Sequence, residues 1–274
     1  MKLSKFMVAL AVLTLLSANA IQGSGQTPKA YADMSRAERL TFVGQEARRI
    51  AREMSGAEYE FTPAFEEDIQ KAVTRYVHRE GNPAAQTKAR QNLHSTFVRG
   101  QAEAPRLIAA FKARNVSPLV GLYLPWIESA FVNIPSANAM GAIGMFQFLP
   151  KTGERYGLSE AELLDVEKSA DAAARYITDS VAEFKDDPMK EALALLAYNR
   201  GAGRTARDLK VSLNEQNRKC SICALNADRS KLDETFRNES AYYVPLFFAA
   251  AIIGENPQVF GLGGAPLSSL ETRR

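Results

Sequence analysis

The chain has 274 residues, which suffices for one large domain or for one domain with a helical extension. Its hydrophobic fraction of 46% supports a core, and its charged fraction of 24% is ordinary for a soluble protein. The formal net charge of +3 falls to +1 once Lys2 and Lys5 are removed, because residues 1–20 carry no acid. A near-neutral protein has no electrostatic case for binding DNA or RNA.

Residues 1–20 have the pattern of a secretory signal. Two lysines precede an apolar run from Phe6 to Leu16 that is too short to span a bilayer. An Ala-Asn-Ala cleavage site follows directly, so we expect the mature chain to begin at Ile21. An uncleaved anchor is the less favoured alternative. The pattern predicts a periplasmic or secreted protein.

Apolar residues recur at three- and four-residue spacing along most of the chain, and no segment alternates with period two. This spacing predicts an all-α protein. Ser35 and Glu38 form a capping box, while Thr62 and Pro63 mark a second helix start. We expect a signal peptide over residues 1–20, a flexible leader over 21–34, an N-terminal helical extension over 35–100, a catalytic domain over 101–260 and a tail over 261–274.

The helices of the extension carry apolar stripes and no obvious chemistry. Leu93 and Phe97 indicate a third helix, and Leu107 and Phe111 indicate a fourth. Packing against the following domain is the interpretation that we prefer, because such stripes are usually core faces. A partner-docking surface is the alternative.

The two cysteines form the sequence C-S-I-C, from Cys220 to Cys223. An oxidising compartment would close them into a small local disulfide, and unpaired structural thiols are the alternative. A redox role would need a thioredoxin-like βαβ setting, and zinc would need further ligands. The two histidines, His78 and His94, are far away in sequence. We therefore predict neither a metal nor a cofactor.

The segment from Leu124 to Phe131 places one carboxylate, Glu128, among apolar residues. Ser117 and Pro118 start its predicted helix, on which Glu128 shares a face with Gly121, Leu124 and Pro125. A lone acid in apolar surroundings suits protonation of a leaving group, because desolvation raises its pKa. A salt-bridged surface glutamate is the alternative.

A Gly-rich loop, Gly141 to Gly144, follows and lets the backbone approach a ligand closely. It lacks the Gly-Lys-Ser/Thr ending of a phosphate loop. Phe146, after the loop, could serve as an apolar platform for a sugar ring or could pack in the core, and both interpretations are open. Gln147 offers an amide that can hydrogen-bond sugar hydroxyl or acetamido groups. Later, Tyr198 and Asn199 stand at a predicted helix end, where polar groups can reach a cleft.

These motifs, with E-S-A-Y-Y-V-P from Glu239 to Pro245, resemble those of the lytic murein transglycosylases with a lysozyme-like catalytic domain. The resemblance is greatest to the membrane-bound D type and covers roughly Val116 to Gly254. It implies a lysozyme-like all-α fold, peptidoglycan glycan strands as substrate, a monomer and no cofactor.

The resemblance also implies roles for individual residues. Glu128 corresponds to the catalytic acid/base, and Ser129 to a serine that positions the substrate or the glutamate. Tyr198 would hydrogen-bond near the catalytic carboxyl, and Asn199 would contact sugar. Further substrate contacts are implied for Asn138, Phe146, Gln147, Glu239 and Tyr243.

The chain departs from the family pattern in several places. Asn138 replaces the serine usual before the loop, with Ser136 close by, and Leu149 replaces a methionine after it. Ala241 and Leu246 replace an arginine and a lysine of the last motif. No cysteine lies near the cleavage site, so the lipid attachment of many membrane-bound relatives is not expected.

The resemblance implies a reaction with one acid/base, whereas hydrolytic glycosidases usually use two carboxylates. Glu128 would cleave the bond between N-acetylmuramic acid and N-acetylglucosamine and form 1,6-anhydro-muramic acid. A goose-type lysozyme is one alternative. A non-catalytic peptidoglycan-binding assembly protein, recruiting cell-wall or secretion machinery through its N-terminal helices, is another. The lysozyme would take its second carboxylate from Glu154, Glu160, Glu162, Asp165 or Glu167.

Overall fold

The computed structural model describes residues 28–80, 92–135 and 140–271. Within these ranges the regular structure is helical, and the one extended pairing is an isolated antiparallel bridge between Ile143 and Phe148. The all-α prediction is confirmed for this part of the chain. The predicted signal, residues 1–20, lies outside it.

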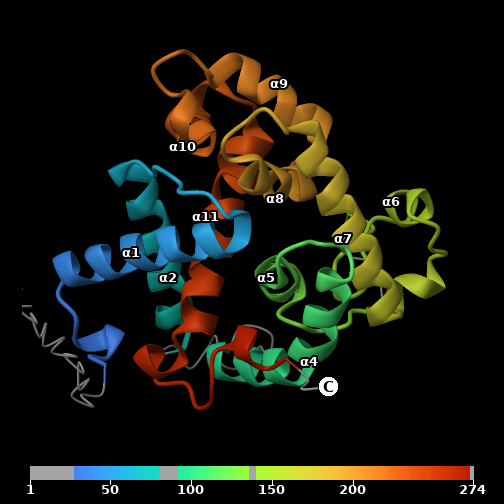
Figure 1. Ribbon diagram of the computed structural model, residues 1–274, viewed down its shortest axis with the longest axis horizontal. Helices are drawn as coiled ribbons and strands as arrows, with labels where there is room; N and C mark the ends of the chain where they lie inside the picture. The colour runs from blue at the N-terminus through green and yellow to red at the C-terminus, as the bar shows by residue number, and fades with distance from the viewer. Residues whose placement is uncertain (1–27, 81–91, 136–139, 272–274) are drawn as a thin grey trace, which may run out of the picture.

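Figure 1 shows the arrangement of the helices. The α-helices are α1 (Arg36–Ser55), α2 (Pro63–Glu80), α4 (Leu93–Lys112), α5 (Pro118–Ser129), α6 (Pro150–Arg155), α7 (Val166–Glu183), α8 (Lys190–Arg200), α9 (Ala202–Ser212), α10 (Ser221–Ala227) and α11 (Ala241–Glu255). The other helical turns are η1 (Tyr31–Asp33), η2 (Ala161–Leu164), η3 (Arg218–Cys220), η4 (Arg229–Lys231), the π-turn η5 (Phe236–Ser240), η6 (Pro257–Phe260) and η7 (Leu267–Ser269).

Local sequence sets the starts of the first two helices, as predicted. Ser35 Oγ accepts a hydrogen bond from the Glu38 backbone N–H, and the Glu38 carboxylate accepts one from the Ser35 N–H at 2.7 Å. Helix α2 begins at Pro63, and Thr62 Oγ1 accepts from the Phe65 N–H at 3.4 Å. Both caps satisfy backbone donors that a helix N-terminus leaves without partners.

The predicted third and fourth helices are wrong as separate elements, because α4 is one continuous helix of 20 residues. Asn92 caps it by accepting from the Ser95 N–H at 2.7 Å. Its run of good helix formers continues through Pro105. The helix also crosses the predicted domain boundary at residue 100, so that boundary is not a division of the fold.

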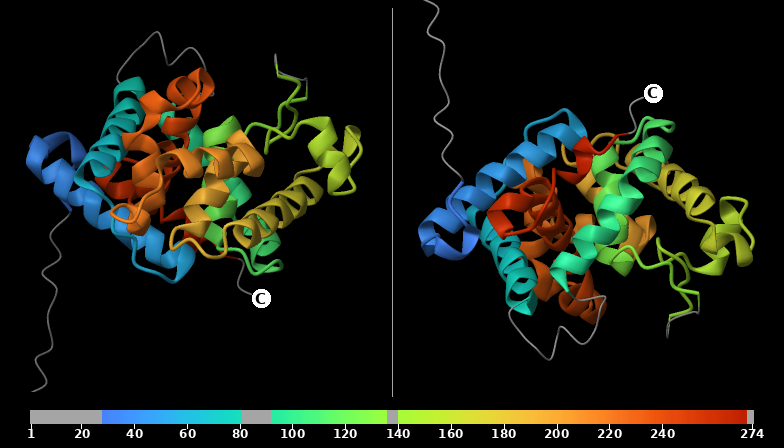
Figure 2. Two further views of the ribbon diagram at one scale, coloured as in Figure 1. Left: turned by 90° about the horizontal axis from the view of Figure 1, so that it is seen from above. Right: turned by 90° about the horizontal axis from the view of Figure 1, so that it is seen from below.

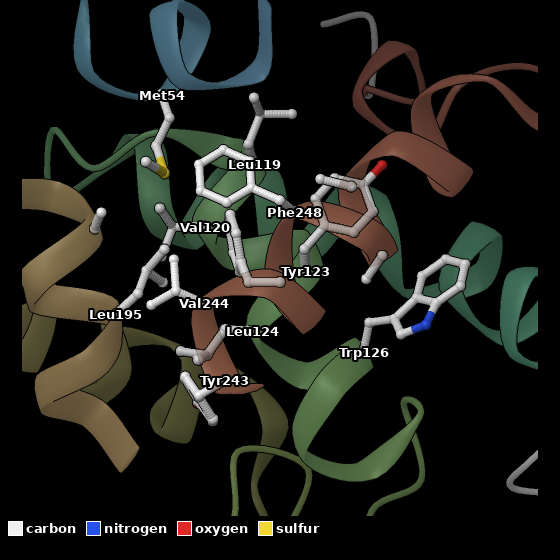
Figure 3. Packing of buried hydrophobic residues seen from close by; sticks show 14 of the residues in the cluster. Met54, Leu119, Val120, Tyr123, Leu124, Trp126, Leu195, Tyr243, Val244 and Phe248 are labelled. Atoms are coloured by element: carbon white, nitrogen blue, oxygen red, sulfur yellow. The ribbon is translucent and has the colours of Figure 1, made fainter. Parts of the chain in front are cut away.

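Helix α11 is the centre of the molecule. It is apolar on all sides and is buried along its length, as expected for a helix with no polar face. It contacts α1, α2, α5 and α8 (Figures 1 and 2). Figure 3 shows its Val244 and Phe248 among side chains from three other helices. Each fully buried Phe or Ile on α11 contributes about 2 kcal/mol to stability.

The N-terminal helices pack into this core. Val43, Ala47 and Ile50 on α1 are fully buried, and α2 packs along α11. Packing, the interpretation that we preferred for these stripes, is confirmed. Cys220 and Cys223 form a disulfide in the described structure, and Cys223 Sγ accepts from the Thr62 N–H at the start of α2.

Parts of the predicted leader and tail are also packed into the core. Tyr31, placed in the flexible leader, is buried with its ring centroid 5.0 Å from that of Phe260. Leu267, placed in the loose tail, is fully buried. Both assignments are wrong for these residues. Each is a single buried side chain in a polar or Gly-containing segment, which has no apolar pattern to indicate burial.

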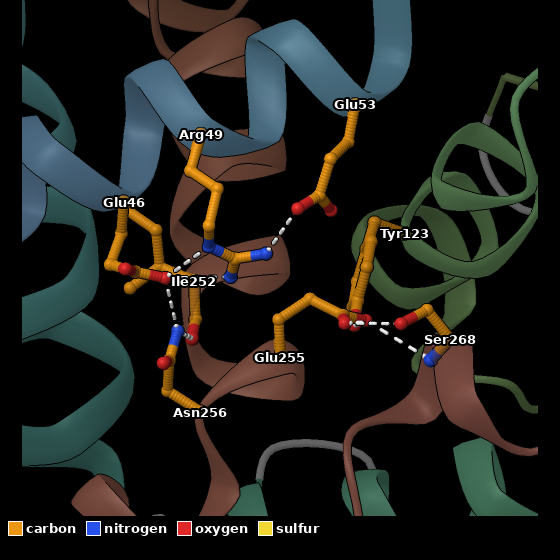
Figure 4. A network of polar contacts seen from close by, with 8 residues as sticks. All are labelled: Glu46, Arg49, Glu53, Tyr123, Ile252, Glu255, Asn256 and Ser268. Atoms are coloured by element: carbon orange, nitrogen blue, oxygen red, sulfur yellow. Dashed lines mark hydrogen bonds and ion pairs between the residues drawn. The ribbon is translucent and has the colours of Figure 1, made fainter. Parts of the chain in front are cut away.

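A buried polar network fixes the C-terminal segment (Figure 4). Glu255, at the end of α11, accepts hydrogen bonds from the Tyr123 hydroxyl and from the backbone N–H and hydroxyl of Ser268. Burial first, and then the charge of Glu255, raise the pKa of Tyr123 well above its usual value. The network joins η7 to both α11 and α5.

Replacing Leu267 by Ala should lower the free energy of unfolding by about 2 to 5 kcal/mol, because it removes a fully buried side chain and leaves a cavity. Chemical denaturation measures this. The matched control is Val211→Ala on α9, which is 55% exposed and should change stability by less than about 0.5 kcal/mol. Equal, small effects would mean that the C-terminal segment is loose after all.

Candidate active site

Helix α5 carries Glu128 one residue before its end. Gly121, Leu124 and Pro125, which share its face, are buried as the sequence predicted. Gly121 allows α4 to come close, because a Cβ there would lie 2.6 Å from the Phe111 ring. The close packing of α4 on α5 therefore contributes to the apolar surroundings of the helix that carries Glu128.

The end of α5 is defined by two residues with left-handed backbone, Ala130 and Phe131, with φ of 55° and 59°. Helix α5 therefore ends at Ser129. Ser129 is buried, and its hydroxyl donates to the Pro125 carbonyl oxygen at 3.1 Å. The hydroxyl thus bonds the carbonyl four residues earlier in its own helix, a common arrangement for a buried helical serine.

Glu128 is half-buried, and the Tyr243 hydroxyl of α11 donates a hydrogen bond to its Oε1. Burial raises the pKa of Glu128 to about 7, while this hydrogen bond acts in the opposite direction because it favours the carboxylate. No charged group among the described side chains contributes to the pKa shift of Glu128. Glu128 therefore exchanges its proton near neutral pH.

Tyr198, near the end of α8, was predicted to hydrogen-bond near the catalytic carboxyl. Its hydroxyl donates to the Phe146 carbonyl oxygen at 2.9 Å. Burial, followed by the charge of Glu128, raises the pKa of Tyr198 well above its usual value. Tyr198 is thus near Glu128 and holds the Gly-rich loop, while the direct hydrogen-bond partner of Glu128 is Tyr243.

The Gly-rich loop is tied to the protein at several points. The Ile143–Phe148 bridge closes it, and the Gly144 N–H donates to the Ile134 carbonyl at 3.0 Å. Gly144 has φ of +80°, and a Cβ there would lie 2.3 Å from the Leu163 carbonyl oxygen. The close approach that this glycine permits is therefore to the protein's own backbone.

The two residues after the loop lie differently from each other. The Phe146 ring is 0% exposed and stacks on Phe111, with centroids 6.1 Å apart, so the structure supports core packing for this side chain. Gln147 is half-buried with φ of 51°, and its Nε2 donates to the Gly144 carbonyl oxygen at 2.7 Å. Its amide helps to shape the loop.

The remaining predicted contacts are spread over two elements. Asn199 is exposed at the end of α8, and Ser240, at the end of η5, donates to its Oδ1 at 2.8 Å. Glu239 is exposed on η5. Asn138 lies outside the described residues. The structure therefore brings Glu128, Tyr198 and Tyr243 together and links Asn199 to the start of α11.

Sequence reasoning missed Arg200, whose side chain is 1% exposed. It binds Asp208 on α9 and Asp233 ahead of η5, with a distance of 2.7 Å from Nη2 to Asp233 Oδ2. The Arg200 guanidinium and the Phe236 N–H hold the pKa of Asp233 at about 2. The sequence feature that could have indicated this residue is its position directly after the Tyr198-Asn199 pair.

Comparison with known proteins agrees with this geometry. Residues 106–221 match the Transglycosylase SLT domain family. Over this segment the chain is similar to the SLT transglycosylases. Its lysozyme-like all-α fold is that of the SLT domain, and Glu128, Tyr198 and Asn199 all lie within the matched residues.

Individual relatives carry names of the same kind. The chain is 27% identical over 178 residues to the membrane-bound lytic murein transglycosylase D of Escherichia coli K12, covering 62% of this chain and 35% of the relative. It is 38% identical over 85 residues to the peptidoglycan transglycosylase gp16 of Escherichia phage T7, covering 29% of this chain and 6% of the relative. The chain thus spans about a third of the length of the first of these relatives.

The SLT match ends at residue 221, yet the structure extends the site beyond it. Tyr243, the hydrogen-bond partner of Glu128, and Ser240, the partner of Asn199, both belong to the later segment that leads into α11. In the part of the chain that the structure describes, no helix has the length and hydrophobicity needed to cross a membrane.

Glu128→Gln should stabilise the protein at neutral and alkaline pH. Since the folded-state pKa of about 7 exceeds the ordinary value of 4.5, ionised Glu128 opposes folding. This penalty is absent below about pH 4.5, grows towards pH 7 and is constant above it. The expected gain at pH 8 is about 1 to 3 kcal/mol, allowing for partial exposure. Urea unfolding at pH 4 and pH 8 measures it, and a gain independent of pH would contradict the assignment.

Tyr243→Phe should raise the pKa of Glu128 further, because it removes a hydrogen bond that favours the carboxylate. Carbon-13 NMR of labelled glutamate, with Glu128→Gln to identify the signal, follows this titration. Tyr242→Phe is the matched control. Tyr242 is the residue before Tyr243 on α11, and its ring lies against Arg75 of α2. A downward shift, or an equal shift in the control, would show that the hydroxyl does not stabilise the carboxylate.

Proposed function

We propose that this protein is a lytic transglycosylase that cleaves the β-1,4 bond between N-acetylmuramic acid and N-acetylglucosamine in peptidoglycan. The observation that carries the proposal is the half-buried Glu128, with a pKa of about 7 and a hydrogen bond from Tyr243. The match of residues 106–221 to the Transglycosylase SLT domain family and the names of the relatives support the substrate class.

In the first step, protonated Glu128 acts as general acid. With a pKa of about 7, a substantial fraction of the carboxyl groups retains a proton at neutral pH and can deliver it to the glycosidic oxygen. The bond from the anomeric carbon to that oxygen breaks, and N-acetylglucosamine leaves with the proton. The acetamido group of the muramic acid stabilises the positive charge that develops at the anomeric carbon.

In the second step, ionised Glu128 acts as general base. It removes the proton from the 6-hydroxyl of the same muramic acid, whose oxygen attacks the anomeric carbon and closes a 1,6-anhydro ring. The Tyr243 hydroxyl hydrogen-bonds the carboxylate between the two steps. Glu128 ends the cycle protonated, and no water is consumed.

The arrangement of acids favours this scheme over hydrolysis by a retaining mechanism, in which a second carboxylate lies close to the acid. In retaining glycosidases the second carboxylate lies about 5 Å from the first and would shift its pKa by charge repulsion. No acid among the described side chains contributes to the pKa of Glu128, and the segments outside the described ranges contain no Asp or Glu. This statement covers every Asp and Glu side chain of the protein except Glu80, whose side chain the structure does not describe.

Two of the five candidate second carboxylates serve local structure. Glu162 accepts from Lys168 and from Ser159, and the hydrogen bond from Lys168, followed by those from Ser159, lowers the pKa of Glu162 to about 2. Asp165 caps α7 by accepting from two backbone N–H groups. These contacts count against both as a catalytic base.

The signal-like N-terminus supports action in the periplasm or outside the cell. The peptidoglycan glycan strand is the proposed partner, bound by a monomer that needs no cofactor. Recruitment of cell-wall or secretion machinery is a weaker proposal, because the apolar stripes of α1 and α2 are buried in the protein's own core.

Mass spectrometry of fragments released from purified peptidoglycan tests the proposal. We expect products ending in 1,6-anhydro-muramic acid, lighter by one water than hydrolysis products. Glu128→Gln should reduce their release by at least about a thousandfold, since the proton donor and acceptor are both lost. Peptidoglycan binding should persist.

Other outcomes separate the alternatives. Reducing-end products would identify a lysozyme, and binding without products would identify a scaffold protein. Glu183→Gln is the matched control and should keep its activity, because Glu183 is exposed at the end of α7 and has no assigned role in the site. An active Glu128→Gln variant would refute the catalytic role of this residue.

A further inference from the structure

Ser240 and Tyr243, three positions apart at the start of α11, contact the two helices that carry Asn199 and Glu128. Ser240 donates to Asn199 Oδ1 on α8, and Tyr243 donates to Glu128 Oε1 on α5. Residues at i and i+3 lie on the same side of a helical segment. The segment from Ser240 to Tyr243 therefore sets the acid and the Asn199 amide relative to each other.

The two partners in the first contact differ in exposure. Ser240 is 2% exposed and is held between η5 and α11, whereas Asn199 is exposed. A buried hydroxyl has few alternative partners, so its orientation is determined by the protein. The exposed amide, in contrast, would rotate freely without this contact.

The contact determines which end of the Asn199 amide faces outwards. Its carbonyl oxygen is engaged by the Ser240 hydroxyl at 2.8 Å. The amide nitrogen, which makes no hydrogen bond within the described structure, is left as a donor of two hydrogen bonds. A fixed donor selects an acceptor, such as the acetamido carbonyl oxygen of an N-acetylated sugar.

We propose that Ser240 is a positioning residue, which fixes the Asn199 amide so that its NH2 group faces an acceptor oxygen of an N-acetylated sugar. The inference rests on the proposed function for the identity of the sugar.

The π-turn η5 places Ser240 where it can make this contact. It spans Phe236–Ser240, and Asp233 just before it is held by Arg200, the residue that follows Asn199. Such turns add one residue to a helical turn and shift the side chains that follow. Arg200 thus holds one end of the η5 segment to α8, and the contact from Ser240 to Asn199 holds the other.

The test measures binding of an N-acetylglucosamine tetramer by calorimetry, with Glu128→Gln as the background to prevent turnover. Ser240→Ala should weaken binding about 3- to 10-fold, the range expected for one lost hydrogen bond. Ser240→Thr should recover most of the affinity. In an Asn199→Ala background, Ser240→Ala should have no further effect, because a positioning residue acts through its partner.

The controls separate positioning from general damage. Ser169→Ala removes another fully buried serine hydroxyl, one that donates to the Val166 carbonyl of its own helix, and should leave affinity unchanged. Additive effects of Ser240→Ala and Asn199→Ala, an affinity loss equal to that of Ser169→Ala, or absence of tetramer binding would each overturn the inference. Because binding is measured without turnover, failure of the proposed chemistry leaves this result interpretable.

Discussion

The structure depends on the burial of α11. A helix with no polar face must be surrounded by other helices, and here those helices come from both the N-terminal and the central parts of the chain. This requirement unites α1 and α2 with α5 and α8 in one core. It also places the first turn of α11 against the end of α5, where Glu128 is located.

The chemistry follows from that placement. Packing around α5 removes water from one side of Glu128, which raises its pKa, while Tyr243 from α11 supplies one hydrogen bond to the carboxylate. The opposing effects leave an acid that can both donate and accept a proton near pH 7. Burying an acid in this way costs stability, which is common where function requires it.

The site is assembled from segments that are distant in sequence but joined by specific contacts. Tyr198 holds the loop through the Phe146 carbonyl, Ser240 holds Asn199, and Arg200 holds the segment before η5. Several side chains near the acid therefore serve other protein groups. Phe146, Gln147 and Ser129 are examples whose polar or aromatic groups bind the protein itself.

The sequence by itself determined the all-α fold, the helix starts at Ser35 and Pro63 and the apolar setting of Glu128, because helical periodicity, caps and short motifs are local properties. It did not determine the continuity of α4, the burial of Tyr31 and Leu267, or the choice of Tyr243 over Tyr198 as the partner of Glu128. Those features depend on which surfaces meet in three dimensions. A single buried side chain in a polar segment, or a hydrogen bond between residues 115 positions apart, leaves no local pattern, so only the tertiary structure decided them.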